Sequence, residues 1–479
     1  RWMRKPSILI MLPATLIMSL ASGSLISPNL NVTLTLVCRA HFAELSNSAE
    51  DFDESRCQIP DVHAKVSRVQ MIIQLISGLL SAIVSPRLGA FSDRYGRKPA
   101  LFIAALGPVL ASAVYMSLLR STYTYAYHFI FLAGVFDGST GSIVSFMLIS
   151  HAYVTDCTTP GTRAHAFSML RAILFAGLSI GPAVSGYIMD TTRDIFPVVY
   201  FSFPLQILFG VYIVLVVPES ISPEARSHAR EMHRISSEFS DAQNRDLKYY
   251  MSQLNVLKPL GVLNPKDGTR RAVKKNLLIL TASEIACYGC ELSAIMIIML
   301  YVELALGWPS SQTSYFMSVT SFARAMTLVF MFPGLVWLYQ RYRPHVQHEV
   351  GVSKGDVFLI RLSFVFMAVS YILMAITKSS SGFMFAGALG AIGSFGSPQI
   401  TSAITKNVSK ENTGAVLGAL ALLQNAATII GPIILSSVYS YTVGFFPQAI
   451  FLVVTGIYMA AFIGTLFLTE HAGGGLYDN

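Results

Sequence analysis

Apolar runs of about twenty residues recur along the whole chain, and a run of that length is what a helix needs to cross a lipid bilayer. Of the 479 residues, 53% are hydrophobic and only 13% are charged, whereas a soluble domain carries roughly a quarter charged residues. A soluble protein of this composition lacks the polar residues to cover its surface. The sequence therefore predicts an all-α, polytopic membrane protein.

Charged residues, glycines and prolines separate twelve such runs. The first is too long for a removable signal peptide and is expected to remain as a helix. The predicted spans are 7–34, 67–88, 99–119, 124–153, 165–189, 197–217, 275–303, 312–338, 357–377, 381–404, 412–439 and 444–468.

A polar stretch, 218–274, divides the spans into two sets of six. It predicts an N-terminal half over 1–217, a cytoplasmic linker with partial helix that serves mainly as a tether, and a C-terminal half over 275–479. The two halves also share a pattern, because Gly177-x3-Gly181-Pro182 has a weaker counterpart in Ala427-x3-Gly431-Pro432. Parallel repeats of this kind occur in transporters whose two halves move around a central site.

The loops predict the orientation, since Lys and Arg accumulate on cytoplasmic loops. Basic residues precede the first span and follow the second, fourth, eighth and tenth spans, whereas the first loop on the other side is acidic. Both termini are thus expected in the cytoplasm, in a plasma or vacuolar membrane. The net charge of +8 follows from this topology and does not indicate nucleic-acid binding.

Two of the five cysteines, Cys38 and Cys57, fall in the first, acidic loop. They can form a disulfide if that loop is extracytoplasmic, and they can equally remain free. Cys287 and Cys290 form a C-x-x-C pattern inside an apolar helix, where no redox or metal role is expected.

The densest motif, Gly89-Ala-Phe-Ser-Asp93-Arg94-Tyr-Gly96-Arg97-Lys98, follows the second span. Its glycines permit a tight turn, and Asp93 is expected to cap the next helix. Its basic residues hold the turn at the cytoplasmic face. On these grounds alone it is an anchored turn.

The motif also matches the pattern G-x-x-x-D-R-x-G-R-[KR] between the second and third helices of the major facilitator superfamily, which the chain therefore resembles over nearly its whole length. The resemblance implies a latch that forms in one conformation and breaks in another. Asp156 is expected to face Arg97 in this latch, with Arg163 beside it.

The fifth span resembles an element of the superfamily's proton-coupled drug antiporters, with Gly177, Gly181, Pro182 and Gly186 at its fixed positions. Small residues at this spacing also serve simple helix packing. The fourth span departs from those antiporters, because Asp137 stands near where many of them carry an arginine. The chain is also similar to fungal relatives of the proton-coupled folate transporter at 93–99 and 257–260, and those relatives imply uptake rather than export.

Ionisable residues inside spans are functional candidates by default. Asp137, Glu284 and Arg324 fall near mid-membrane, and Arg171 lies in the inner half of its helix. A buried carboxyl can exchange a proton near neutral pH, so Asp137 and Glu284 are the candidates for proton coupling. Arg324 suits an anionic substrate or an ion pair with an acid, and the charges can also neutralise each other as structural pairs. Further candidates to line a site are Glu291, Gln399, Gln424 and Asn425.

Together these features predict a monomeric secondary active transporter of a small organic solute, coupled to protons and working by alternating access. Its expected partners are the solute, protons and membrane lipid, without nucleic acid or a cofactor. The alternatives are a uniporter or symporter of organic anions and a transporter-like nutrient sensor. An enzyme is not expected, because no metal-ligand cluster, nucleophile elbow or phosphate-binding loop is present in the sequence.

Overall fold

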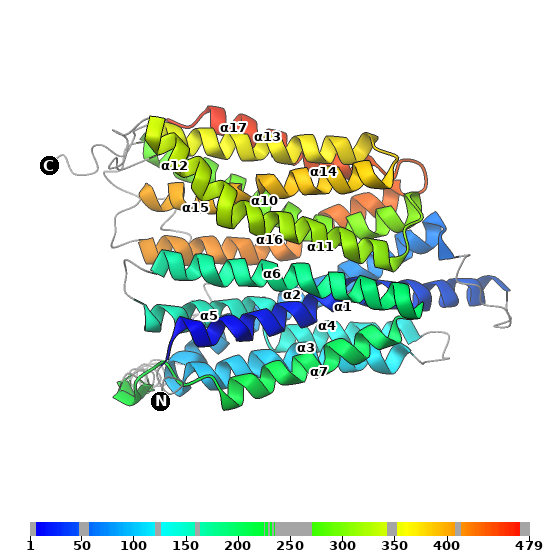
Figure 1. The fold of residues 1–479 in the computed structure, drawn as a ribbon, viewed down its shortest axis with the longest axis horizontal. Helices are drawn as coiled ribbons and strands as arrows, with labels where there is room; N and C mark the ends of the chain where they lie inside the picture. Colours follow the sequence, from blue (N-terminus) through cyan, green and yellow to red (C-terminus); the bar gives the residue numbers. More distant parts are fainter. Residues whose placement is uncertain are drawn as a thin grey trace, which may run out of the picture. The chain divides into compact units, whose positions relative to one another are not determined.

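The computed structural model describes residues 6–46, 57–119, 126–158, 163–224, 226–228, 230–231, 234, 271–342, 352–407 and 413–469. Most of the predicted linker, the acidic part of the first loop and residues 257–260 lie outside these ranges. Across them the chain is helical, which confirms the all-α fold class (Figure 1).

The helices of the first half follow the predicted spans within a few residues at most ends. They are α1 (Ile8–Ser46), α2 (Pro60–Tyr95), α3 (Arg97–Leu119), η3 (Ala126–Phe129), α4 (Ile130–Ser139), α5 (Ser142–Cys157), α6 (Arg163–Thr192) and α7 (Phe196–Leu215). The predicted fourth span is bent where α4 meets α5, at Gly141, whose φ of 84° places it in the left-handed region.

The second half repeats this plan. Its elements are α10 (Arg271–Ala305), α11 (Ser310–Met326), η5 (Thr327–Met331), α12 (Phe332–Tyr342), α13 (Lys354–Ile376), α14 (Ser380–Ile392), η7 (Gly393–Phe395), α15 (Gly396–Lys406), α16 (Thr413–Thr442) and α17 (Ala449–Leu466).

Eleven helices of the described residues are long and apolar enough to cross a membrane. The remaining predicted span, 381–404, is the tenth along the chain and is occupied by α14 and α15, which the short 3₁₀ segment η7 separates. Each piece is too short to span a bilayer alone, because a span needs roughly 20 residues. The run Gly393-Ser-Phe-Gly396 at the break explains the interruption, since glycine weakens a helix interior.

Contacts between residues divide the chain into two units. Unit 1 contains residues 1–247 and 302–322, and unit 2 contains residues 248–301 and 323–479. Unit 1 thus includes Val302–Phe322, the end of α10 and most of α11, which we call the α10–α11 hairpin. The predicted boundaries at 217 and 275 remain a prediction.

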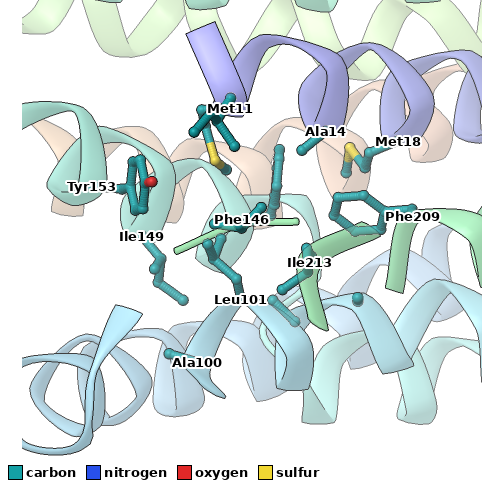
Figure 2. Packing of buried hydrophobic residues seen from close by; sticks show 14 of the residues in the cluster. Met11, Ala14, Met18, Ala100, Leu101, Phe146, Ile149, Tyr153, Phe209 and Ile213 are labelled. Carbon is teal, nitrogen blue, oxygen red and sulfur yellow. The ribbon is translucent and has the colours of Figure 1, made fainter. Parts of the chain in front are cut away.

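An apolar cluster joins α1, α3, α5 and α7 within unit 1 (Figure 2). Phe146 of α5 meets Phe209 of α7 edge to face, with ring centroids 5.3 Å apart. Met11 and Met18 of α1 pack above these rings. Lipid is as apolar as these side chains, so close packing rather than exclusion of water holds such helices together.

The most extensive helix contact of unit 1 is that of α1 and α6, which lie side by side in Figure 1. A Cβ added at Gly181 would lie 2.9 Å from the backbone nitrogen of Ser24 and nearer still to the carbonyl oxygen of Leu20. A Cβ at Gly177 would lie 2.9 Å from the backbone nitrogen of Leu20. Two glycines four residues apart therefore let the two backbones touch.

This approach predicts a stability difference between two glycine substitutions. Gly181→Ala should lower the unfolding temperature of the purified protein by several degrees, because forcing a methyl group into a packed contact costs about 1–3 kcal/mol. Gly210→Ala is the control, since nothing lies within 4 Å of a Cβ at that position of α7. It should leave the unfolding temperature unchanged or raise it, and equal losses in both variants would contradict the packing account.

Candidate functional site

The guanidinium of Arg97 is the centre of a polar cluster where α2 ends and α3 begins. Its Nη1 donates to Asp93 Oδ1 and to Ser92 Oγ, each at 2.6 Å, and its Nε donates to Asp156 Oδ2 at 3.1 Å. The Arg97 side chain is 11% exposed, against 58% for Asp93. One cation thus ties α2, α3 and α5 together, and we call this end of unit 1 the motif end.

Glu219, which follows α7, supplies the cap of α3. Its carboxylate accepts the backbone N–H groups of Arg97 at 2.8 Å and Lys98 at 3.2 Å. The prediction that Asp93 caps this helix is wrong, because Asp93 lies in the last turn of α2 and binds the Arg97 side chain instead. Gly96 has φ +115°, and a Cβ there would collide with the Glu219 carboxylate. No local sequence signal points to Glu219, because the helix that it caps lies more than a hundred residues earlier in the chain.

The remaining residues of the predicted latch contribute less to this cluster. Arg94 Nε donates to the carbonyl of Ala90 in its own helix at 3.0 Å. A Cβ added at Gly89 would meet Leu148 of α5 at 3.4 Å, an ordinary contact distance. Arg163 is the first residue of α6, and its side chain lies outside the described part of the structure.

The α10–α11 hairpin makes polar contacts with α1. Ser27 Oγ donates to the Ser310 carbonyl at 2.9 Å, and Asn31 Nδ2 donates to Ser310 Oγ at 2.8 Å. Since these residues lie toward the C-terminal end of α1, we call this end of unit 1 the hairpin end.

The hairpin also contacts α6. Ser179 Oγ donates to the Ser318 carbonyl at 3.1 Å, and Tyr315 is hydrogen-bonded to Asp190. A Cβ at Gly186 would lie 2.9 Å from the Tyr315 ring and 3.0 Å from the Ser311 carbonyl oxygen. The glycine motif of α6 therefore serves two faces: Gly177 and Gly181 meet α1, and Gly186 meets α11.

Asp137, the predicted acid of the fourth span, lies in α4 and accepts a hydrogen bond from Ser77 of α2 at 2.6 Å. Arg171 of α6 is exposed and lies close enough to His151 of α5 to act on it electrostatically. The two predicted candidates of this half thus have different surroundings. Asp137 is hydrogen-bonded between two helices, whereas the side chain of Arg171 is exposed.

Glu284 is fully buried in α10, in unit 2, where three helices meet. Its Oε1 accepts a hydrogen bond from Ser397 Oγ of α15 at 2.5 Å and another from Gln424 Nε2 of α16 at 2.8 Å. The structure therefore brings together Glu284 and Gln424, two of the predicted candidates. Asn425, the next residue, lies partly buried on α16, and its carbonyl accepts from Thr428.

Arg324 of α11 forms an ion pair with Glu291 of α10, with Nη1 and Oε1 2.5 Å apart. Of the two readings of Arg324, an anionic substrate or an ion pair with an acid, the structure shows an ion pair, and its acid is Glu291, two helical turns after Glu284 on α10. Directly after Arg324, Thr327–Met331 forms a π-helical turn, a local widening that is frequent at functional sites.

A second polar cluster of unit 2 joins α13 and α15, and sequence reasoning missed most of it. Asp356 Oδ1 accepts from Gln399 Nε2 at 2.6 Å and from Lys406 Nζ at 2.9 Å. Asp356 also completes a capping box with Ser353 at the start of α13. The Ser-x-x-Asp pattern at 353–356 is the sequence signal that points to it. Gln399, predicted to line a site, is instead part of this cluster.

Cys38 and Cys57 form a disulfide in the structure, with an S–S distance of 2.01 Å. The bond joins the C-terminal part of α1 to the turn before α2. Cys157, Cys287 and Cys290 are free, and the described residues contain no group of three or more side chains that could hold a metal ion.

Comparison with known proteins decides the family. The model of the Major Facilitator Superfamily matches residues 18–352, more than two thirds of the chain. The chain belongs to the major facilitator superfamily. Its similar relatives include the MFS-type transporter avaJ of Aspergillus versicolor, 28% identical over 96% of this chain and 89% of the relative. The class B tetracycline resistance protein of Escherichia coli is 21% identical over 84% of this chain and 87% of its own.

Solved structures agree with the superfamily fold. The human organic anion transporter MFSD10 superposes with a TM-score of 0.59 and 15% identity, over 96% of this chain and 98% of the other. A peptide transporter POT variant superposes with a TM-score of 0.56 over 96% of this chain and 95% of its own. At such low identity these likenesses establish the fold alone. The superfamily membership makes the chain an integral multi-pass transporter of a small molecule and not an enzyme.

The Glu291–Arg324 pair predicts which acid of α10 the fold depends on. Glu291→Gln should lower stability by roughly 3–5 kcal/mol, because it leaves a largely buried cation unpaired. The matched variant Glu284→Gln keeps the size of the side chain and removes no partner from Arg324, so its loss should be much smaller. Thermal unfolding of the purified variants measures both.

The double variant Glu291→Gln/Arg324→Gln should recover most of that stability, since neither charge then remains unpaired. A Glu284→Gln variant as unstable as Glu291→Gln would show that Arg324 depends on both acids and would contradict the pairing.

Proposed function

We propose that this superfamily member is a proton-coupled secondary transporter that moves a small organic solute by alternating access. The observation that carries the proposal is Glu284, a buried carboxyl on α10 held by the hydroxyl of Ser397 and the amide of Gln424. Both of these partners are neutral and each can donate or accept. A hydroxyl and an amide can hydrogen-bond both the protonated and the ionised form of the carboxyl.

Orientation in the membrane follows from the two ends of unit 1. The disulfide between Cys38 and Cys57 favours an oxidising compartment for the hairpin end, since disulfides persist outside the cytosol. The basic residues of the motif end favour the cytoplasm. We therefore place the hairpin end outside and both termini inside, in the plasma membrane or the vacuolar membrane.

The Arg97 cluster is proposed as the cytoplasmic latch. The side chain of Arg97 bonds to Asp93 and Asp156, and its backbone N–H bonds to Glu219. These bonds hold together the ends of α2, α3 and α5 and the segment after α7. Asp93 is the exposed member, so it is the one that can exchange partners when the conformation changes.

The solute is best sought by a thermal-shift screen of the purified protein, because a bound ligand raises apparent stability. The tetracycline resistance relative suggests drug-like compounds as one set of probes. Organic anions form the second set, since the exposed Arg171 offers a cation and the structurally similar MFSD10 is an organic anion transporter. Glu291 already neutralises Arg324, which favours the first set.

Proton coupling predicts a specific defect in Glu284→Gln, tested in liposomes with the solute that the screen identifies. The amide imitates the protonated acid permanently. This variant should bind solute and exchange it at equal concentrations, but it should lose accumulation driven by a proton gradient. Its solute affinity should also lose pH dependence.

Asp137→Asn is the matched control, because Asp137 also accepts a hydroxyl hydrogen bond within a span. It should keep proton-driven accumulation. If accumulation persists in Glu284→Gln and is lost in Asp137→Asn, the coupling site is in the first half and the assignment to Glu284 is refuted.

A further inference from the structure

The last turn of α10 carries a carboxyl that the proposed mechanism does not use. Glu303 is 3% exposed, and neither of its carboxylate oxygens has a hydrogen-bond partner among the described residues. The other two acids of α10 differ from it, since Glu284 accepts hydrogen bonds from two side chains and Glu291 pairs with Arg324.

Among the described residues, no ion pair compensates Glu303 either. The ionisable side chains that the structure describes on α1, α6, α10 and α11, besides Glu303 itself, are Arg39, His41, Arg171, Tyr187, Asp190, Arg271, Lys274, Lys275, Glu284, Cys287, Tyr288, Cys290, Glu291, Tyr301, Tyr315 and Arg324. Among them Asp190 is hydrogen-bonded to Tyr315, and Arg324 is paired with Glu291.

An ionised carboxylate without a partner in an apolar environment costs several kcal/mol, and such a group takes up a proton instead. In the conformation that the structure describes, Glu303 is therefore the neutral acid. A conformation that admits water to this turn would remove the penalty and let the proton leave.

The position of Glu303 in the chain indicates that water reaches its carboxyl when the α10–α11 hairpin moves. α10 ends two residues later, at Ala305, and the turn through Gly307, with φ +62°, leads to Ser310. Ser310 is the residue that Ser27 and Asn31 of α1 hold. By its contacts, Val302–Phe322, which includes Glu303, belongs to unit 1. Separation of the hairpin from α1 and α6 therefore breaks the hydrogen bonds to Ser310 and removes Glu303 from unit 1.

We propose that Glu303 is a proton-binding site at the hairpin end, separate from Glu284, and that its protonation is required for the α10–α11 hairpin to close against α1 and α6. The inference rests on the alternating access of the proposed function, but it depends neither on the solute nor on Glu284. Acid then favours the closed hairpin, and alkali favours the open one.

Spin labels on both sides of the contact test this site without any solute. Thr191→Cys on α6 and Gln312→Cys on α11 are both exposed, and Thr191 bonds only within its own helix. Labelling uses a background in which Cys157, Cys287 and Cys290 are replaced by Ser. Double electron–electron resonance then gives the distance distribution at acid and at alkaline pH.

With Glu303 intact, a single short distance between the labels at positions 191 and 312 is expected at acid pH. At alkaline pH a second population with a longer distance between the labels should appear. Glu303→Gln should keep the short distance at both pH values, whereas Glu303→Asp should retain the pH shift. Asp190→Asn is the control, and it should also retain the shift.

A distance distribution that does not change with pH when Glu303 is intact would overturn the proposal, even if Glu303→Gln fails to fold. A pH shift that survives in Glu303→Gln would overturn it as well. Transport by Glu284→Gln tests only the assignment of the coupling site, and the distances between the spin labels test only the Glu303 site. Failure of one proposal is therefore distinguishable from failure of the other.

Discussion

The backbone contact between α1 and α6 is the constraint on which the other features of unit 1 depend. Gly177 and Gly181 remove the side chains that would hold the two helices apart, and in lipid this close packing is the main source of helix association. With one face of α6 fixed on α1, its next turns present Ser179, Gly186 and Asp190 to α11. A single helix thus sets both the packing within unit 1 and the contact with the α10–α11 hairpin.

Apart from the exposed Arg171, the charges and carboxyls named above for the spans follow one rule, which is that a partner from another helix holds them. Arg97 meets Asp156, Asp137 meets Ser77, Glu291 meets Arg324, and Asp356 meets Lys406. Unpartnered charge is costly in this environment, so these pairs fix which helices lie together. Glu303 departs from the rule among the described residues, and it does so beside the contact that has to open in an alternating-access cycle.

The fold was predictable from the sequence because lipid imposes a length on every span, and length is visible in the apolar runs. The break at η7 was not predicted, since hydropathy does not register a local change of helix type. The sequence also could not predict which side chains of different helices form pairs. The spacing of Glu284 and Glu291 shows that they share a face of α10, but only the register of α10 against α11 decides that Arg324 meets Glu291. Glu219 was overlooked for the same reason, because its partners lie more than a hundred residues earlier in the chain.

The central claim, that the hairpin end opens and closes during transport, is tested most directly by cross-linking it shut. Cysteines at Asn31 and Ser310, which are hydrogen-bonded at 2.8 Å, can be joined by a disulfide or a short bifunctional thiol reagent in a background without the three free cysteines. The control pair is Ser24 and Ser202, whose hydroxyls are 2.5 Å apart between α1 and α7, two helices that stay together in the proposed cycle. Transport should stop when the first pair is joined, return on reduction, and continue with the second pair joined. Undiminished transport with the first cross-link fully formed would contradict the account.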